Sequence, residues 1–200
     1  MSATLFNPDL LILLKHLGPP QRENNRSCHV LDIGHGKTGM ALELARYGYD
    51  VVALNSETPS LDMLAKTGLH EVSDVYARFT ETSGLHIIGT TVESYEASGL
   101  FDGICCFNFL HSRKSWSDVA IVLDKITALS SAQGVFLLSW ITHDSLRARD
   151  VYFPQQNDVF SYLIYKKWNG ITAWTKEITH KHDGLPLHQH TVSYAAWRKQ

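Results

Sequence analysis

The chain lacks an excess of positive charge and lacks any long apolar run, and each absence argues against a class of partner. Its 200 residues include 18 lysines and arginines against 20 aspartates and glutamates, which gives a formal net charge of −2. We therefore expect no nucleic-acid partner, because nucleic-acid-binding proteins gather positive charge on one surface. The apolar run at 10–14 is only five residues long, whereas a membrane span needs roughly 20. We expect neither a membrane partner nor a signal peptide.

Cysteine is also scarce, and its positions indicate a reducing compartment. The chain has three cysteines, so they cannot all pair in disulfides. Cys105 and Cys106 are adjacent within the apolar run 101–109. There we expect small buried hydrophobic side chains with a raised thiol pKa rather than nucleophiles. This use of cysteine predicts a cytoplasmic protein.

The most informative segment that is present is VLDIGHGKTGMALELA at 30–45, which has the pattern of a strand, a turn and a helix. Gly34, Gly36 and Gly39 lie in the turn. Glycine has no Cβ and a helix N-terminus offers free N–H groups, so such a turn lets the backbone approach a small ligand closely. A second strand at 50–54 ends in the polar residues Asn55 and Ser56. This arrangement is typical of the start of a nucleotide-binding α/β sheet.

The rest of the chain continues the alternation of strands and helices. Apolar runs predict strands at 30–33, 51–54, 85–88, 101–109 and 135–140. Helical spacing predicts helices at 7–17, from 39 to about 48, at 59–69 and at 118–129. Alternation of this kind predicts a doubly wound, mostly parallel sheet with right-handed crossovers.

The pattern changes in the C-terminal part of the chain. Residues 171–182 and 188–198 resemble two strands around the turn signal at 183–186, which predicts an antiparallel hairpin at the edge of the sheet. We expect one α/β domain over 1–200. Within it, 1–29 form an N-terminal helix and connector, 30–140 the nucleotide-binding core, and 141–200 the acceptor-side region and terminal hairpin.

In these segments the chain resembles the class I S-adenosylmethionine (SAM)-dependent methyltransferases, and most of all the tellurite-resistance methyltransferase family. The resemblance covers 30–200 and is carried by LDIGHG at 31–36, GYDVVALN at 48–55, FDGICCFNFLH at 101–111 and YAAWRK at 194–199. It implies a seven-stranded Rossmann-like methyltransferase sheet that binds SAM at the carboxyl ends of its first, second and fourth strands. It also implies S-adenosylhomocysteine (SAH) as product and a small-molecule acceptor, with chalcogen oxyanions among the candidates.

The resemblance also implies which residues contact the cofactor. In the family the acid at the position of Asp32 supports the glycine loop and the amino group of the ligand, and the end of the second strand holds the ribose. The cofactor-binding residues expected on this basis are Asp32, Gly34, His35, Gly36, Asn55, Ser56, Thr90, Thr91 and Phe107.

At three positions that contact the ligand in the family, this sequence departs from the family pattern. Thr38 stands where the family has its third glycine, and Asn55 stands where the family has an acid that accepts both ribose hydroxyls. Thr90 or Thr91 stands where the family places an acid for the adenine amino group, and the next acid is Glu93. An amide has one acceptor oxygen where a carboxylate has two. These departures favour an alternative, a non-catalytic methyltransferase-fold protein that binds another ligand or a protein partner.

A candidate general base follows the fourth strand. His111 stands where many methyltransferases carry a histidine that faces the acceptor, and imidazole is the commonest general base. The competing interpretation is that His111 caps the strand or the next helix. His143 and Asp144 follow the fifth strand and could line the acceptor pocket.

Histidine pairs flank the predicted hairpin turn, as His180-x-His182 and His188-x-His190. Alternation in a strand turns both members of a pair to one side, so four imidazoles could hold a transition metal. The sequence places no cysteine or carboxylate cluster beside them, and hairpin histidines commonly face solvent. We therefore assign no metal site from the sequence.

Aromatic residues are numerous in the C-terminal part of the chain. Tyr152, Phe153 and Tyr162 could form an aromatic wall of the acceptor pocket, although such residues are more often core. Trp168 and Trp174 are read either as anchors of the core or as part of a self-association face, so a homodimer is considered as a partner state.

Overall fold

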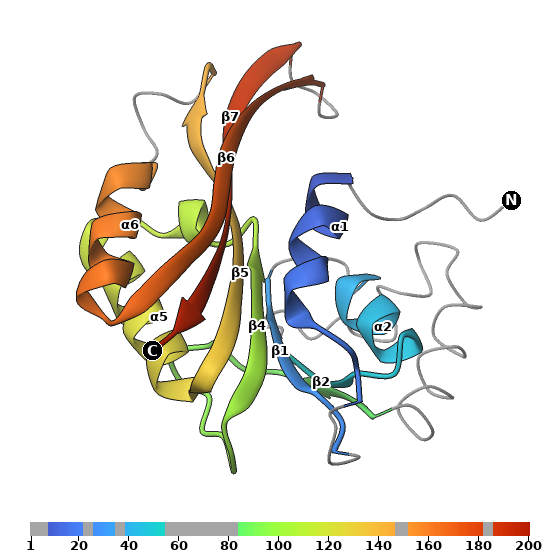
Figure 1. Cartoon of the computed structure of the whole chain (residues 1–200). Helices are drawn as coiled ribbons and strands as arrows, with labels where there is room; N and C mark the ends of the chain where they lie inside the picture. The colour runs from blue at the N-terminus through green and yellow to red at the C-terminus, as the bar shows by residue number, and fades with distance from the viewer. Residues whose placement is uncertain (1–7, 22–25, 35–38, 55–83, 147–151, 182–185) are drawn as a thin grey trace, which may run out of the picture.

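A computed structural model describes residues 8–21, 26–34, 39–54, 84–146, 152–181 and 186–200. Its sheet has seven strands in the order β3-β2-β1-β4-β5-β7-β6 (Figure 1). β1 to β5 run parallel, whereas β7 pairs antiparallel with both β5 and β6. The predicted α/β fold with a C-terminal antiparallel hairpin is therefore confirmed. The strands are β1 His29–Ile33, β2 Asp50–Leu54, β3 Leu85–Ile88, β4 Phe101–Phe107, β5 Ser130–Asp144, β6 Trp168–His180 and β7 His188–Lys199.

Helices cover both faces of the sheet. On one face lie α1 (Pro8–Leu14), its 3₁₀ continuation η1 (Lys15–Leu17) and α2 (Gly39–Arg46), which pack in one apolar cluster. On the other face lie α5 (Trp116–Leu129) and α6 (Gln156–Tyr165), in a second cluster (Figure 1). All seven residues of β4 are buried, as expected for a central strand covered on both faces. None of the helices in the described residues combines the length and apolarity needed to cross a membrane.

The sequence explains where the long helix α5 begins and which face it buries. The Ser115 side chain accepts a hydrogen bond of 3.2 Å from the backbone N–H of Asp118, which caps the N-terminus of α5. Val119, Val122, Leu123 and Ile126 follow at helical spacing, and all four are fully buried against the sheet.

Several predicted strands differ in their bounds from the observed ones; the hairpin strands expected at 171–182 and 188–198 lie at 168–180 and 188–199. The fourth strand was expected to reach residue 109 but ends at Phe107, because Asn108 takes a left-handed backbone with φ of 54°. The fifth was expected over 135–140 but runs from Ser130 to Asp144, because Ser130 pairs with Phe101 of β4 and Asp144 pairs with His190 of β7. A run of apolar residues predicts the buried middle of such a strand. It does not predict how far pairing with a neighbouring strand extends the strand at its ends.

Helix α6 was not predicted, because only Val159 and Leu163 of its ten residues are buried. The expectation that Tyr162 forms a wall of the acceptor pocket is wrong. Tyr162 lies on α6, where its hydroxyl donates a hydrogen bond of 2.9 Å to Asp124 and its ring meets that of Trp116 edge-on, both on α5.

The two tryptophans considered for a self-association face have different surroundings. Trp168 is 1% exposed, and its indole N–H donates a hydrogen bond of 3.0 Å to the Thr127 hydroxyl of α5, so it is an anchor of the core. Trp174 is half-buried, stacks on Tyr194 and donates to Asp9 of α1. Trp168 is therefore excluded from such a face.

The packing of η1 on the centre of the sheet gives a stability prediction. A Cβ at Gly103 of β4 would collide with the Cδ2 of buried Leu17. We expect Gly103→Ala to lower the free energy of unfolding by about 1–3 kcal/mol, the usual cost of overpacking. In a Leu17→Ala background this cost should shrink, because the obstructing methyl is absent. Urea unfolding measures both.

Gly99→Ala serves as the control, because a Cβ there would meet nothing within 4 Å. It should change the free energy of unfolding by less than about 0.5 kcal/mol. Equal effects of the substitutions at Gly103 and Gly99 would contradict the contact between η1 and β4.

Candidate functional site

The carboxyl ends of the central strands meet at one edge of the sheet. In register, Asp32 of β1 lies between Ala53 of β2 and Cys105 of β4. The chain continues from β1 directly into Gly34. The strand order reverses between β1 and β4, because β2 and β3 lie on one side of β1 and β4 and β5 on the other. Ligands of open α/β sheets bind at such a reversal, outside the carboxyl ends of the strands.

A crevice opens at this edge. Its walls include Ile33, Gly34, Leu54, Thr90, Phe109 and Arg113. Its volume is about 20 Å³, room for roughly one water molecule. Residues 35–38 and 55–83, which follow β1 and β2 in the chain, lie outside the described residues.

A larger hollow of about 690 Å³ runs along the edge strand β3 and reaches His29 and Asp50 at the amino ends of β1 and β2. It therefore extends away from the strand ends where cofactors of this sheet type bind. We assign the candidate site to the smaller crevice on this ground.

Asp32 of β1 immediately precedes Ile33 and Gly34, which line the crevice. It is partly buried, and the backbone N–H of Ala41, in the first turn of α2, forms a hydrogen bond with its carboxyl. Burial raises the pKa of Asp32 to about 7, and the hydrogen bond from Ala41 acts in the opposite direction with a smaller effect. Near neutral pH the carboxyl is thus balanced between its protonated and ionised forms. A cation beside it would favour the ionised form.

One wall residue of the crevice, Arg113, forms an ion pair. The Nη1 of Arg113 lies 2.7 Å from the Oε1 of Glu93, and the guanidinium stands 4.2 Å above the centre of the Phe109 ring. Glu93 is the acid that follows Thr90 and Thr91, and its carboxylate is engaged by Arg113. Sequence reasoning missed this pair, because no local pattern relates residues so far apart in the chain.

His111 lies in a 3₁₀ turn, η2 (Leu110–Ser112), just beyond β4. Its Nδ1 accepts a hydrogen bond of 3.3 Å from the backbone N–H of Ile141. The pairing of β4 with β5 ends at Phe107 and Ser139, so the imidazole takes the place of a strand partner for β5. With Nδ1 as acceptor, the proton of the neutral ring is on Nε2. His111 thus has a structural role, and its role as a base stays a prediction.

The other predicted cofactor residues divide into two groups. Thr90 is half-buried at the crevice, Thr91 is exposed and accepts a hydrogen bond from the N–H of Ser94, and Phe107 is 9% exposed within the cluster of α1 and α2. Residues that lie outside the described part of the chain are His35, Gly36, Thr38, Asn55 and Ser56.

Two histidines of β7 and two cysteines of β4 are buried. For His188 and His190 the sequence left open a metal site and a position facing solvent. The two side chains are 5% and 6% exposed, and Asp144 of β5 lies beside them. The side chain of His180 and residue His182 lie outside the described part. Cys105 and Cys106 are fully buried, as predicted, and burial raises the pKa of both thiols.

Solved structures of other proteins share this fold, although the comparisons of sequence find no match. No family model matches the sequence, and no curated protein matches it either. Among solved structures, TehB from Haemophilus influenzae aligns with a TM-score of 0.71 and 16% identity over 99% of this chain and 64% of that one.

Two further structures hold SAH. The 1,6-didemethyltoxoflavin-N1-methyltransferase of Burkholderia thailandensis aligns with a TM-score of 0.68 and 20% identity, over 97% of this chain and 77% of that one. The N-methyltransferase NodS of Bradyrhizobium japonicum aligns with a TM-score of 0.65 and 12% identity, over 96% and 88%. This chain therefore has the fold of the class I SAM-dependent methyltransferases.

Proposed function

We propose that the chain is a SAM-dependent methyltransferase that acts on a small molecule. The observation that carries the proposal is the position of Asp32, at the reversal of strand order and against the first turn of α2. A partly buried carboxyl with a raised pKa gains most from a cationic ligand, because the cation offsets the cost of ionising it. SAM carries an ammonium group on its methionine part, and two similar structures hold its product SAH.

The chain's residues would bind and orient this cofactor. Asp32 pairs with the ammonium group, Gly34 lets the backbone approach, and Asn55 and Ser56 hold the ribose, with Thr90 on the adenine side. When bound, SAM supplies an electrophilic methyl group on its sulfonium. The remaining demand on the protein is to align the acceptor with that methyl group and to exclude water.

His111 is proposed to handle the proton of the acceptor. With Nδ1 bonded to Ile141, the proton of the neutral ring is on Nε2. To accept a proton at Nε2 as a base, the ring must first have its own proton on Nδ1 instead of Nε2. To donate a proton or a hydrogen bond from Nε2, it keeps the proton there. For the acceptor we propose soft nucleophiles such as tellurite and selenite, on the basis of the resemblance of 31–36 and 101–111 to the tellurite-resistance family.

A second function is favoured by the ion pair at the crevice. Arg113 engages Glu93, and the described crevice is narrow. A methyltransferase fold with so narrow a crevice could bind another ligand, or a protein partner, without catalysis. A measurement of SAM binding distinguishes the two proposed functions.

Calorimetric titration with SAM and with SAH tests the proposed function. We expect both to bind in the micromolar range, whereas no heat up to millimolar ligand would favour the non-catalytic alternative.

Asn55→Asp should tighten binding by about tenfold, because a carboxylate offers two charged acceptors and a charge-assisted hydrogen bond contributes about 1.5–3 kcal/mol. The exposed Asn157→Asp on α6 makes the same change away from the site and should leave the affinity unchanged.

The affinity for SAM should depend on pH through Asp32. Its pKa is about 7 in the free protein, and an ammonium ligand requires the ionised form. The affinity should therefore rise as the pH increases from about 5.5 to about 7, approaching tenfold per unit at the lower end. Binding should release a proton, which calorimetry in buffers of different ionisation enthalpy detects.

Asp32→Asn is the matched variant for this measurement, because the amide keeps the shape of the side chain but does not titrate. It should bind SAM more weakly and with no pH dependence over the same interval. A wild-type affinity that does not change with pH would contradict the pairing of Asp32 with the ligand.

The role of His111 is tested by turnover with selenite or tellurite, measured as SAH formed. His111→Gln keeps an acceptor for the N–H of Ile141 but cannot transfer a proton near neutral pH. We expect its kcat to fall by about 10²–10⁴-fold, with an unchanged KM for SAM. If His111 has only its structural role, the glutamine variant should turn over like the wild type.

A further inference from the structure

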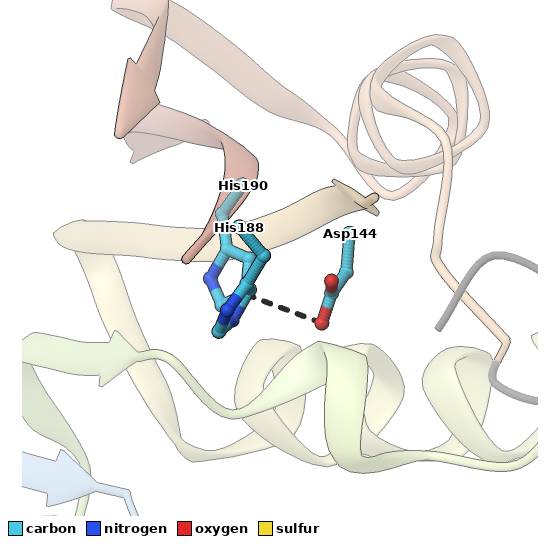
Figure 2. A group of neighbouring side chains, drawn as sticks. All are labelled: Asp144, His188 and His190. Atoms are coloured by element: carbon cyan, nitrogen blue, oxygen red, sulfur yellow. Dashed lines mark ion pairs between the residues drawn. The ribbon is translucent and has the colours of Figure 1, made fainter. Parts of the chain in front are cut away.

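Three buried side chains converge where β5 ends and β7 begins. Asp144 is the last residue of β5 and lies directly opposite His190 of β7 in the antiparallel register. His188 is two residues earlier on β7, so it faces the same side of the strand as His190. The three residues are between 5% and 6% exposed. Figure 2 shows their side chains directed toward one another.

The spacing of their donor atoms suits a single ion. The Nε2 of His190 lies 3.2 Å from the Oδ2 of Asp144, and one ligand atom from each of the three residues lies within 4.8 Å of the others. In a tetrahedral zinc site with bonds of about 2.0–2.1 Å, neighbouring donors stand about 3.4 Å apart. The pair of Asp144 and His190 already has this spacing, and a ligand atom of His188 lies within 4.8 Å of both.

Outer contacts hold two of the three groups in place. The Nδ1 of His188 lies 2.9 Å from the carbonyl oxygen of Pro186, which can only accept, so Nδ1 carries the proton and Nε2 presents its lone pair. The Oδ1 of Asp144 accepts a hydrogen bond of 2.8 Å from the N–H of Leu146, while its Oδ2 faces His190. Metal-binding histidines and carboxylates are commonly oriented by such contacts.

A simple ion pair does not use all three groups. His190 and Asp144 alone could form one, with His190 protonated. The ring of His188 nevertheless lies with its centre 4.7 Å from that of His190. Two protonated rings this close would repel each other, and a buried imidazole and carboxylate are costly to desolvate. One divalent cation interacts favourably with both neutral rings and with the carboxylate.

We propose that Asp144, His188 and His190 bind one divalent transition-metal ion such as Zn²⁺. Two imidazoles and one carboxylate are the ligand set of open zinc and iron(II) sites, in which further positions remain for water or another ligand. The ion would join the end of β5 to the β6–β7 hairpin. This inference goes beyond the proposed function and does not depend on it, because the site lies at β5, two strands from β1 in the sheet.

The test is titration of the chelator-treated full-length chain with Zn²⁺, followed by calorimetry. We expect one tight equivalent. His190→Ala removes a ligand, and Asp144→Asn removes the charge while keeping an acceptor for the N–H of Leu146. Loss of an outer-shell partner alone costs about 10–100-fold in affinity, so each variant should weaken Zn²⁺ binding by about 100-fold or more.

His143→Ala is the matched control, since His143 is the exposed neighbour of Asp144 on the same strand. Its Zn²⁺ affinity should equal that of the wild type. If His143→Ala loses the tight equivalent, or if Asp144→Asn and His190→Ala keep it, the assignment of ligands is overturned.

Co²⁺ gives a second measurement that needs no variant. In the wild type, Co²⁺ in a site of low coordination number should give visible d–d bands much stronger than those of the hydrated ion, and Zn²⁺ should abolish them by competition. A Co²⁺ spectrum equal to that of the hydrated ion, or no tight Zn²⁺ equivalent in the wild type, would overturn the proposal even if the variants fail to fold.

Discussion

β1 is hydrogen-bonded on both sides to parallel strands, and this pairing determines where chemistry can occur in the molecule. Because β2 and β4 flank β1 in parallel register, their carboxyl ends and the turn after β1 meet at one edge. Asp32 is held there between the strand and the first turn of α2. The helices on the two faces bury the strands, and ligands of open α/β sheets bind at the carboxyl edge. The proposed cofactor site follows from the sheet order rather than from any single motif.

Two acidic residues at the carboxyl edge are stabilised in different ways. The carboxyl of Asp32 in β1 accepts a hydrogen bond from the backbone N–H of Ala41 and has a raised pKa, so a cationic ligand would favour its ionised form. Asp144 of β5 is paired with His190 and accepts from Leu146, in a cluster with His188. The first group suits an organic ammonium, and the second suits a metal ion. The two sites share one edge of the sheet but are separated by β4.

The arrangement of strands could be read from the sequence because each buried strand is a short apolar run between turn signals. The glycine-bearing segment at 30–45 and the hairpin near the C-terminus were recognisable for this reason. The end of β4 was not, because it depends on the left-handed backbone of Asn108. Helix α6 was missed because two buried residues make no periodic pattern.

The candidate sites were predictable to different degrees. Asp32 and Gly34 follow from local sequence and from the family resemblance. The ion pair of Glu93 with Arg113, and the approach of Asp144 to the two histidines, arise from contacts between segments distant in the chain. Strand register places Asp144 opposite His190, and no local pattern encodes that register. The burial of His188 and His190 could not be predicted from the sequence for this reason.

The central claim is that an adenosyl ligand lies across the carboxyl ends of β1 and β2. A crystal structure of the chain grown with SAH measures this most directly. We predict that the ammonium group of SAH lies within hydrogen-bond distance of the Asp32 carboxylate and that the ribose lies beside Asn55. A crystal with saturating SAH in which this edge holds no ligand, or in which Arg113 and Glu93 block it, would contradict the claim.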